Sequence, residues 1–266
     1  CDMFLFNKDL AEDYEFMLKG YENGILSKER LYEANRRILA LKAALGLHEK
    51  KKNHSLVPPE EGLSVLRCEE HVAWSKELAD HAVTLVKDTE NNLPLSPEKT
   101  KRILLEILGE YPSNKRIIKT VTDLLEKNGF EVFPYEKEDF RRGVDNVKTF
   151  HEKYDMVLYI GNVENASNQT TTRINWYTFW GQGNNVPWFA CEVPVVFVSL
   201  ANPYHLLDVP MIKTYINCYS NNDYVIEAAI EKLLGRSEFK GTSPVDAFCG
   251  LMDCVDELHL APARQR

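Results

Sequence analysis

The chain has 266 residues and a formal net charge of −8, with 44% hydrophobic and 27% charged residues. This composition is typical of globular proteins. The acidic balance, without a clustered basic footprint, excludes a dedicated nucleic-acid-binding protein. No apolar run approaches the roughly 20 residues that cross a bilayer, so we expect no membrane partner.

Six cysteines lie at positions 1, 68, 191, 218, 249 and 254. None forms a C-x-x-C pair, and the spacing of the last two does not fit a zinc site. We therefore expect reduced thiols, a cytoplasmic location and no metal or cofactor. The chain begins with Cys1-Asp2-Met3, without a signal peptide, and we expect that other residues precede it in the natural protein.

The first 47 residues predict one strand and two helices. The apolar run 3–6 indicates the end of a buried strand. Helical periodicity follows over residues 10–21, and a second helix is expected from the N-cap Ser27 to a stop at Gly46. Residues 48–67, which are charged and contain a Pro-Pro step, predict a linker.

Residues 68–246 alternate between strand and helix patterns and predict an α/β domain, followed by a tail at 247–266. The expected strands are 83–86 (with an end near 93–95), 103–108, 131–134, 156–160, 193–200 and 212–219, and the expected helices are 69–81, 117–125, 138–153 and 223–234. Strands that are apolar throughout are buried on both faces. The pattern therefore predicts a doubly wound, mostly parallel sheet in a flavodoxin-like α/β sandwich.

Several segments resemble family 3 glycoside hydrolases. Cys1-Asp2-Met3 resembles the last strand of the catalytic (β/α)8 barrel in that family. "GILSKERLYEANRRILALKAALGL" at 24–47 resembles a signature of the family and is the most specific match in the chain. "HAVTLVKDTENNLPL" at 81–95, "VPVVFVSLANPYHL" at 193–206 and "FKGTSPVD" at 239–246 resemble parts of its second domain. The resemblance implies that residues 1–47 are the last unit of a truncated barrel and that 68–246 are the C-terminal α/β sandwich domain.

The resemblance also implies an activity for a longer parent protein. The β-glucosidase-like branch carries its acid/base glutamate near a Glu-Gly-x-Asp-Arg sequence, which the stretch 161–176, "GNVENASNQTTTRINW", lacks. This stretch resembles the β-N-acetylhexosaminidase branch, in which the nucleophilic Asp and an Asp–His pair lie in barrel loops. The implied parent is a retaining hydrolase of terminal β-linked N-acetylglucosaminides, with the missing barrel as partner of this domain. We expect no catalytic residue in the present chain.

Ligands bind parallel α/β sheets beyond the carboxyl ends of the strands, here at 109–110, 161–164 and 201–203. The carboxylates near these ends are Glu110, Glu164 and Asp208, of which Glu164 is best placed. The candidate substrate-binding residues are Asn162, Glu164, Arg173 and Asn202. Arg173 is a sugar or carboxylate ligand in one interpretation and one half of a helix-face salt bridge in the other.

Three tryptophans, Trp176, Trp180 and Trp188, are spaced by four and eight residues. This spacing indicates a helical stripe packed on the sheet or on the barrel, although a sugar-stacking platform is the alternative. Two other functions stay open. The chain is a free-standing sugar- or partner-binding module in one of them, and in the other it is the C-terminal domain of a β-glucosidase-like parent with Glu164 as the acid/base.

Overall fold

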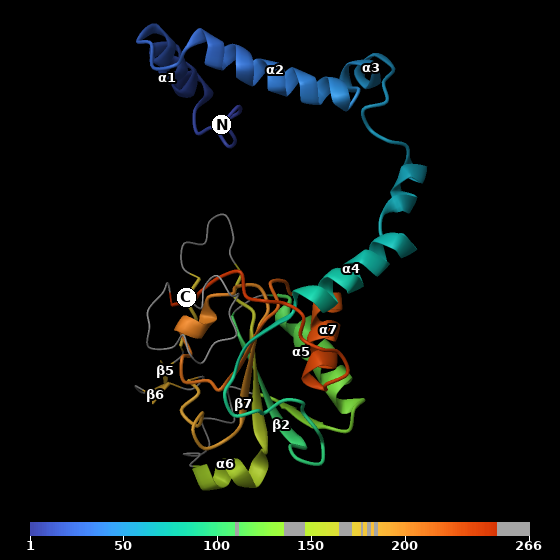
Figure 1. Ribbon diagram of the computed structural model, residues 1–266, viewed down its shortest axis with the longest axis vertical. Helices are drawn as coiled ribbons and strands as arrows, with labels where there is room; N and C mark the ends of the chain where they lie inside the picture. The colour runs from blue at the N-terminus through green and yellow to red at the C-terminus, as the bar shows by residue number, and fades with distance from the viewer. Residues whose placement is uncertain are drawn as a thin grey trace. The chain divides into compact units, whose positions relative to one another are not determined.

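The computed structural model describes residues 1–109, 112–135, 147–164, 172–176, 178–179, 182–183 and 186–248 (Figure 1). The chain divides into two compact units, Cys1–Cys68 and Glu69–Arg266. Among the helices in the described ranges, none is both long and apolar enough to cross a membrane.

The first unit is helical. Its elements are α1 (Leu10–Glu22), α2 (Lys28–Ala44), α3 (Leu47–Lys52) and the 3-10 helix η1 (Glu60–Val65). Asp9 caps α1 by accepting hydrogen bonds from the backbone N–H groups of Ala11 and Glu12, and Ser27 caps α2 by accepting from that of Arg30 at 3.1 Å. Both predicted helices and the predicted Ser27 cap are confirmed.

One prediction for the first unit is wrong, and a second segment is more helical than its sequence pattern indicates. Residues 3–6 form no strand and are 60–98% exposed, because no strand among the described residues pairs with this segment. The stretch 48–67, which is predicted to be a linker, contains most of α3 and all of η1. Its run of Glu and Lys has good helix propensity, and η1 begins directly after the Pro-Pro step.

The second unit is built on a six-stranded sheet in the order β1-β8-β7-β4-β2-β3. The strands are β1 (Thr84–Asp88), β2 (Arg102–Leu108), β3 (Glu131–Pro134), β4 (Met156–Gly161), β7 (Val195–Ser199) and β8 (Thr214–Asn217). All neighbours pair in parallel except β1, which is antiparallel to β8. The predicted doubly wound, mostly parallel sheet is confirmed.

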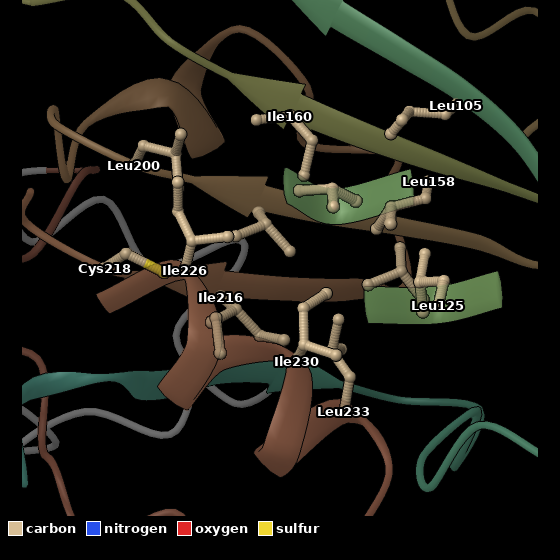
Figure 2. Close-up of a cluster of buried hydrophobic side chains, with 14 of the residues drawn as sticks. Leu105, Leu125, Leu158, Ile160, Leu200, Ile216, Cys218, Ile226, Ile230 and Leu233 are labelled. Atoms are coloured by element: carbon tan, nitrogen blue, oxygen red, sulfur yellow. The ribbon is translucent and has the colours of Figure 1, made fainter. Parts of the chain in front are cut away.

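Helices α5 (Asn114–Glu126) and α7 (Asp223–Leu233) cover one face of this sheet and lie next to each other (Figure 1). Side chains from alternate strand positions meet the two helices in a core that includes Leu158, Ile216, Leu125 and Ile230 (Figure 2). Helix α4 (Glu69–Ala82) packs on α7. There the fully buried Lys232 ammonium donates to Asp80 at 3.0 Å.

The other face of the sheet carries a second core, which is rich in aromatic side chains. Tyr159, Phe197 and Tyr215 come from neighbouring strands, and their rings stack side by side. Helix α6 (Val147–Lys153) contributes Phe150, and the turn that precedes β7 contributes Phe189. The sheet is therefore covered on both faces, as its apolar strands require.

Three details differ from the sequence prediction. Residues 93–95 are not a strand, and the helix expected over 138–153 is seen only from Val147, since 136–146 lie outside the described residues. The helix expected over 176–188 is wrong, because this region holds the short antiparallel strands β5 (Thr178–Phe179) and β6 (Gln182–Gly183) and a turn. Two glycines and Pro187 interrupt the aromatic spacing, and both residue types disfavour a continuous helix.

Candidate functional site

The carboxyl edge of the sheet contains a topological switch point between β2 and β4. From β2 the chain passes through α5 to β3 on one side, and then returns through α6 to β4 on the other side of β2. In doubly wound folds, ligands bind outside the carboxyl ends of the strands at such a point. Gly109 follows β2 here, and Asn162 follows β4.

Asn162 organises a network of amides at this switch point. Its side chain is fully buried, and its Nδ2 donates to Asn114 Oδ1 at 2.6 Å and to Ser113 Oγ at 3.1 Å. Its Oδ1 accepts a hydrogen bond from Asn221 Nδ2 at 3.1 Å. One side chain thereby connects β4, the start of α5 and the loop that precedes α7.

The same network orients Glu164, which is half-buried. Asn221 Nδ2 donates to Glu164 Oε1, and the carbonyl of Asn221 accepts from Arg116 Nη2 at 2.8 Å. The carboxylate of Glu164 therefore accepts a hydrogen bond from the neutral amide of Asn221, and Asn221 is itself held by Asn162 and Arg116. This arrangement places Glu164 at the strand edge that the sequence indicated.

A second group of polar side chains follows β7. Asn202 is buried, donates from Nδ2 to the carbonyl of Thr172 at 3.1 Å and accepts from the backbone N–H of Tyr204 at 2.9 Å. The hydroxyl of the buried Ser199 donates to the carbonyl of Asn202. These bonds attach the segment 172–176 to the loop after β7.

Asp208 completes this attachment. Its carboxylate, with a side chain 4% exposed, accepts from Arg173 Nε and from the backbone N–H of Ile174, and it lies 3.2 Å from Nδ1 of the buried His205. Burial acts to raise the pKa of Asp208, but the hydrogen bonds with His205 and Arg173 outweigh burial and hold this pKa below its usual value. Asp208 is therefore an ionised anchor for Arg173.

The structure separates the four candidate binding residues into two kinds. Asn162 and Asn202 are at most 1% exposed, and their side-chain amides donate hydrogen bonds to protein groups. Glu164 is half-buried, and the Arg173 side chain is 59% exposed. A ligand at this edge would meet Glu164 and Arg173, with the two buried amides acting as their supports.

The remaining candidates are Glu110, the three tryptophans and the salt bridge expected for Arg173. Glu110 and Trp180 lie outside the described residues. Trp176 is half-buried and packs against the aromatic core, and Trp188 makes edge contacts with Phe150 and Phe189. The salt bridge expected for Arg173 is confirmed, but it joins two loops, and the helix face expected for it is wrong.

Sequence reasoning missed Asn114, Asn221 and His205 as members of these networks. Asn221 follows the carboxyl end of β8 and Asn114 begins α5, so their positions at strand and helix ends were the available signal. Nothing in the local pattern of His205 indicated its contact with Asp208. Within the described ranges, no group of three or more His, Cys, Asp or Glu side chains is arranged to hold a metal ion.

Comparison with known proteins gives the family. No protein-family model matches the chain. The β-N-acetylglucosaminidase/β-glucosidase of Cellulomonas fimi is 40% identical over 260 residues, which are 95% of this chain and 45% of that protein. The structure of the β-glucoside phosphorylase BglX is 41% identical with a TM-score of 0.75, over 96% of this chain and 45% of that one. A family 3 β-N-acetylglucosaminidase from Paenibacillus sp. str. FPU-7 has a TM-score of 0.51 at 19% identity, over 86% and 42% of the two chains.

The chain matches the C-terminal part of family 3 glycoside hydrolases. It spans about 45% of the length of the two relatives with 40% and 41% identity. The resemblance seen in the sequence is thereby confirmed at the level of the family. The names of these relatives combine N-acetylglucosaminidase, glucosidase and phosphorylase, so they do not separate one branch of family 3 from the others.

The described carboxylates near this edge are engaged by protein groups. A retaining glycosidase uses two carboxyl groups about 5–5.5 Å apart, one as nucleophile and one as acid. Asp208 is engaged on both oxygens, and Glu164 accepts from Asn221. Glu106, whose pKa burial raises to about 8, lies 3% exposed within the sheet face and is out of reach of a ligand at the edge.

Proposed function

We propose that this chain is the non-catalytic C-terminal domain of a longer family 3 enzyme that cleaves terminal β-linked N-acetylglucosaminides. The observation that carries the proposal is 40% identity along 95% of this chain to a protein named for N-acetylglucosaminide and glucoside cleavage. The missing Glu-Gly-x-Asp-Arg sequence over 161–176 favours the N-acetylglucosaminide over the glucoside. The nucleophile and the acid then belong to a barrel that precedes this domain.

The first unit supports a barrel as the partner. No residue of α1 or α2 is buried, and large apolar side chains such as Leu10, Tyr14 and Leu41 are 58–75% exposed. Apolar faces of this extent mark surfaces that another part of a protein covers. The two relatives carry more than half of their length outside the matched region, which is enough chain to supply the rest of a barrel.

The proposal predicts that the isolated chain does not release p-nitrophenol from p-nitrophenyl N-acetylglucosaminide or p-nitrophenyl glucoside. The full-length protein should cleave the first substrate faster than the second. Turnover by the isolated chain that survives repurification and disappears in Glu164→Gln would contradict the proposal. That result would favour the β-glucosidase-like alternative, with Glu164 as the acid/base.

A second candidate concerns the acceptor of the sugar. The relative that is 41% identical is named a β-glucoside phosphorylase, which transfers its glycosyl group to phosphate. In a covalent mechanism the enzyme's glycosyl ester is opened either by water or by a phosphate oxygen. The products are then the free sugar or the sugar 1-phosphate. Phosphorus NMR of the full-length reaction with and without inorganic phosphate distinguishes the two.

A further inference from the structure

Arg173 differs from the other arginines described in the sheet domain by what its guanidinium contacts. Arg102, Arg116 and Arg236 each direct both terminal nitrogens at protein oxygens. Arg173 uses Nε alone, on Asp208. Among the described residues, neither of its terminal nitrogens has a protein partner, and the side chain is 59% exposed.

The orientation of the Arg173 guanidinium is fixed by its contact with Asp208. The Asp208 side chain is only 4% exposed, and its carboxylate is held by His205 and by the backbone N–H of Ile174. His205 is itself buried, and its ring lies against the end of β4, where a Cβ built on Gly161 would come within 3.5 Å of Cδ2. Because Asp208 already restrains the side chain, less rotamer entropy is lost when a ligand binds it.

The exposed part of Arg173 is a planar fork of two N–H-bearing nitrogens. This geometry matches two oxygens of one phosphate or carboxylate group, whereas a sugar hydroxyl offers only one acceptor at a time. The fork lies at the carboxyl edge of the sheet, in the segment that returns from the loop after β4. That edge is where doubly wound folds bind their ligands.

We propose that Arg173 binds inorganic phosphate as the glycosyl acceptor of the full-length enzyme. This inference rests on the phosphate-dependent form of the proposed function. A phosphate oxygen attacks the anomeric carbon of the glycosyl-enzyme, the bond from that carbon to the enzyme carboxylate breaks, and the sugar 1-phosphate leaves. Arg173 holds the two oxygens that do not attack, and Asp208 keeps the guanidinium in the required plane.

The main experiment compares three full-length proteins: the natural sequence, Arg173→Gln and Arg236→Gln. Arg236 is the matched control because its side chain is also about half exposed (51%) and pairs with one glutamate, Glu231. Arg173→Gln should raise the KM for phosphate about tenfold or more, as expected when a hydrogen bond to a charged group is lost. Arg173→Gln should lower the rate of hydrolysis without phosphate much less than the rate of phosphorolysis, and Arg236→Gln should change neither rate.

The outcomes separate the inference from the function it rests on. If the natural full-length enzyme makes no sugar 1-phosphate, both the phosphate-dependent function and the inference about Arg173 are wrong. If sugar 1-phosphate forms but Arg173→Gln keeps the natural KM for phosphate, the inference alone is wrong. Equal losses of phosphorolysis and hydrolysis in Arg173→Gln would also overturn it, because they indicate a structural role.

A direct binding measurement uses the present chain. Inorganic phosphate is titrated while NMR follows the Nε–Hε signals of the arginines, with chloride at the same ionic strength as the control. The natural chain should show one saturable shift that is absent in Arg173→Gln and retained in Arg236→Gln. A shift that persists in Arg173→Gln would place the phosphate elsewhere and contradict the proposal.

Discussion

Glu106 is a carboxyl group buried in the aromatic face of the sheet. It lies on β2 directly opposite Tyr159 of β4, is 3% exposed, and has an Oε1 without a hydrogen-bond partner among the described residues. Burial raises its pKa to about 8 against an ordinary value of 4.5, although the hydrogen bond with Tyr159 acts in the opposite direction. At neutral pH this side chain is therefore mostly protonated in the folded protein.

The raised pKa predicts how stability depends on pH. Between about pH 4.5 and pH 8 the folded chain keeps a proton that the unfolded chain releases, so the free energy of unfolding falls as the pH rises through this window. Each pH unit in this window lowers the free energy of unfolding by about 1.4 kcal/mol at most. Glu106→Gln removes this ionisation, so the free energy of unfolding of the variant should depend less on pH. The variant should also be more stable than the natural chain at pH 8. Urea unfolding at pH 5, 6.5 and 8 measures the effect, and equal slopes for both proteins would contradict it.

Lys232 is a second buried ionisable residue, and it depends on a single carboxylate. Its side chain is fully buried, and Asp80 supplies its negative partner, while Ser237 and the carbonyl of Glu238 accept its other protons. The hydrogen bond with Lys240 is the largest cause of the lowered pKa of Asp80, followed by those with Ser237 and Lys232. This cluster connects α4, α7 and the segment after α7.

Removing the carboxylate should leave the ammonium buried without its counter-charge. Asp80→Ala should lower the free energy of unfolding by roughly 2–3 kcal/mol, which is less than for a fully buried pair because Asp80 is 30% exposed. Asp123→Ala is the control, since its exposed pair with Lys119 contributes less than about 1 kcal/mol. Chemical denaturation of both variants tests this. A loss in Asp80→Ala no larger than that in Asp123→Ala would show that Lys232 does not need the charge.

At the level of elements, the strands in the middle of the sheet carry the stability. β4 lies between β2 and β7, and all six of its residues are buried. Its alternate side chains reach both cores, with Leu158 and Ile160 on the side of α5 and α7 (Figure 2). A substitution in β4 therefore affects the packing on both faces of the sheet.

Leu158→Ala should lower the free energy of unfolding by about 2–5 kcal/mol, because Leu158 is fully buried and the surrounding strands cannot close the cavity. The matched change Leu78→Ala, on α4, should alter stability by less than about 0.5 kcal/mol, since Leu78 is 71% exposed. Thermal and urea unfolding of the two variants gives the comparison. Similar losses in both would mean that the outer face of α4 is covered in solution.

At the level of the whole molecule, the two units differ in how much they bury. The second unit has two cores, whereas no residue of the helices in the first unit is buried. A unit that buries so little contributes little to stability. Its exposed apolar side chains favour association with other surfaces.

A protein that begins at Pro58 should therefore unfold as cooperatively as the full chain, at a similar Tm, and should associate less. A protein that begins at Val83 should be much less stable, because it lacks α4 and the Asp80 partner of Lys232. Calorimetry and analytical ultracentrifugation of the three proteins measure both properties. Loss of cooperative unfolding on removal of residues 1–57 would show that the two units fold together.

The sequence alone determined the elements of the sheet domain and the edge at which its polar residues gather. The apolar runs of β2, β4, β7 and β8 and the Ser27 cap could be predicted because each depends on residues close together in the chain. Asn162 and Glu164 could be placed at the carboxyl edge for the same reason. The aromatic spacing over 176–188 was misleading, because helical and strand-and-turn structures both accommodate it.

Only the tertiary structure decided which side chains meet. Arg173 and Asp208 are 35 residues apart in the chain, and Asn221 and Asn162 are 59 apart, yet each pair is in hydrogen-bond contact. The order of the strands creates these contacts, and strand order leaves no local pattern in the sequence. The burial of Glu106 likewise depends on which face of β2 the aromatic residues of β4 and β7 cover. Local periodicity therefore determined the elements, and packing between distant segments determined their chemistry.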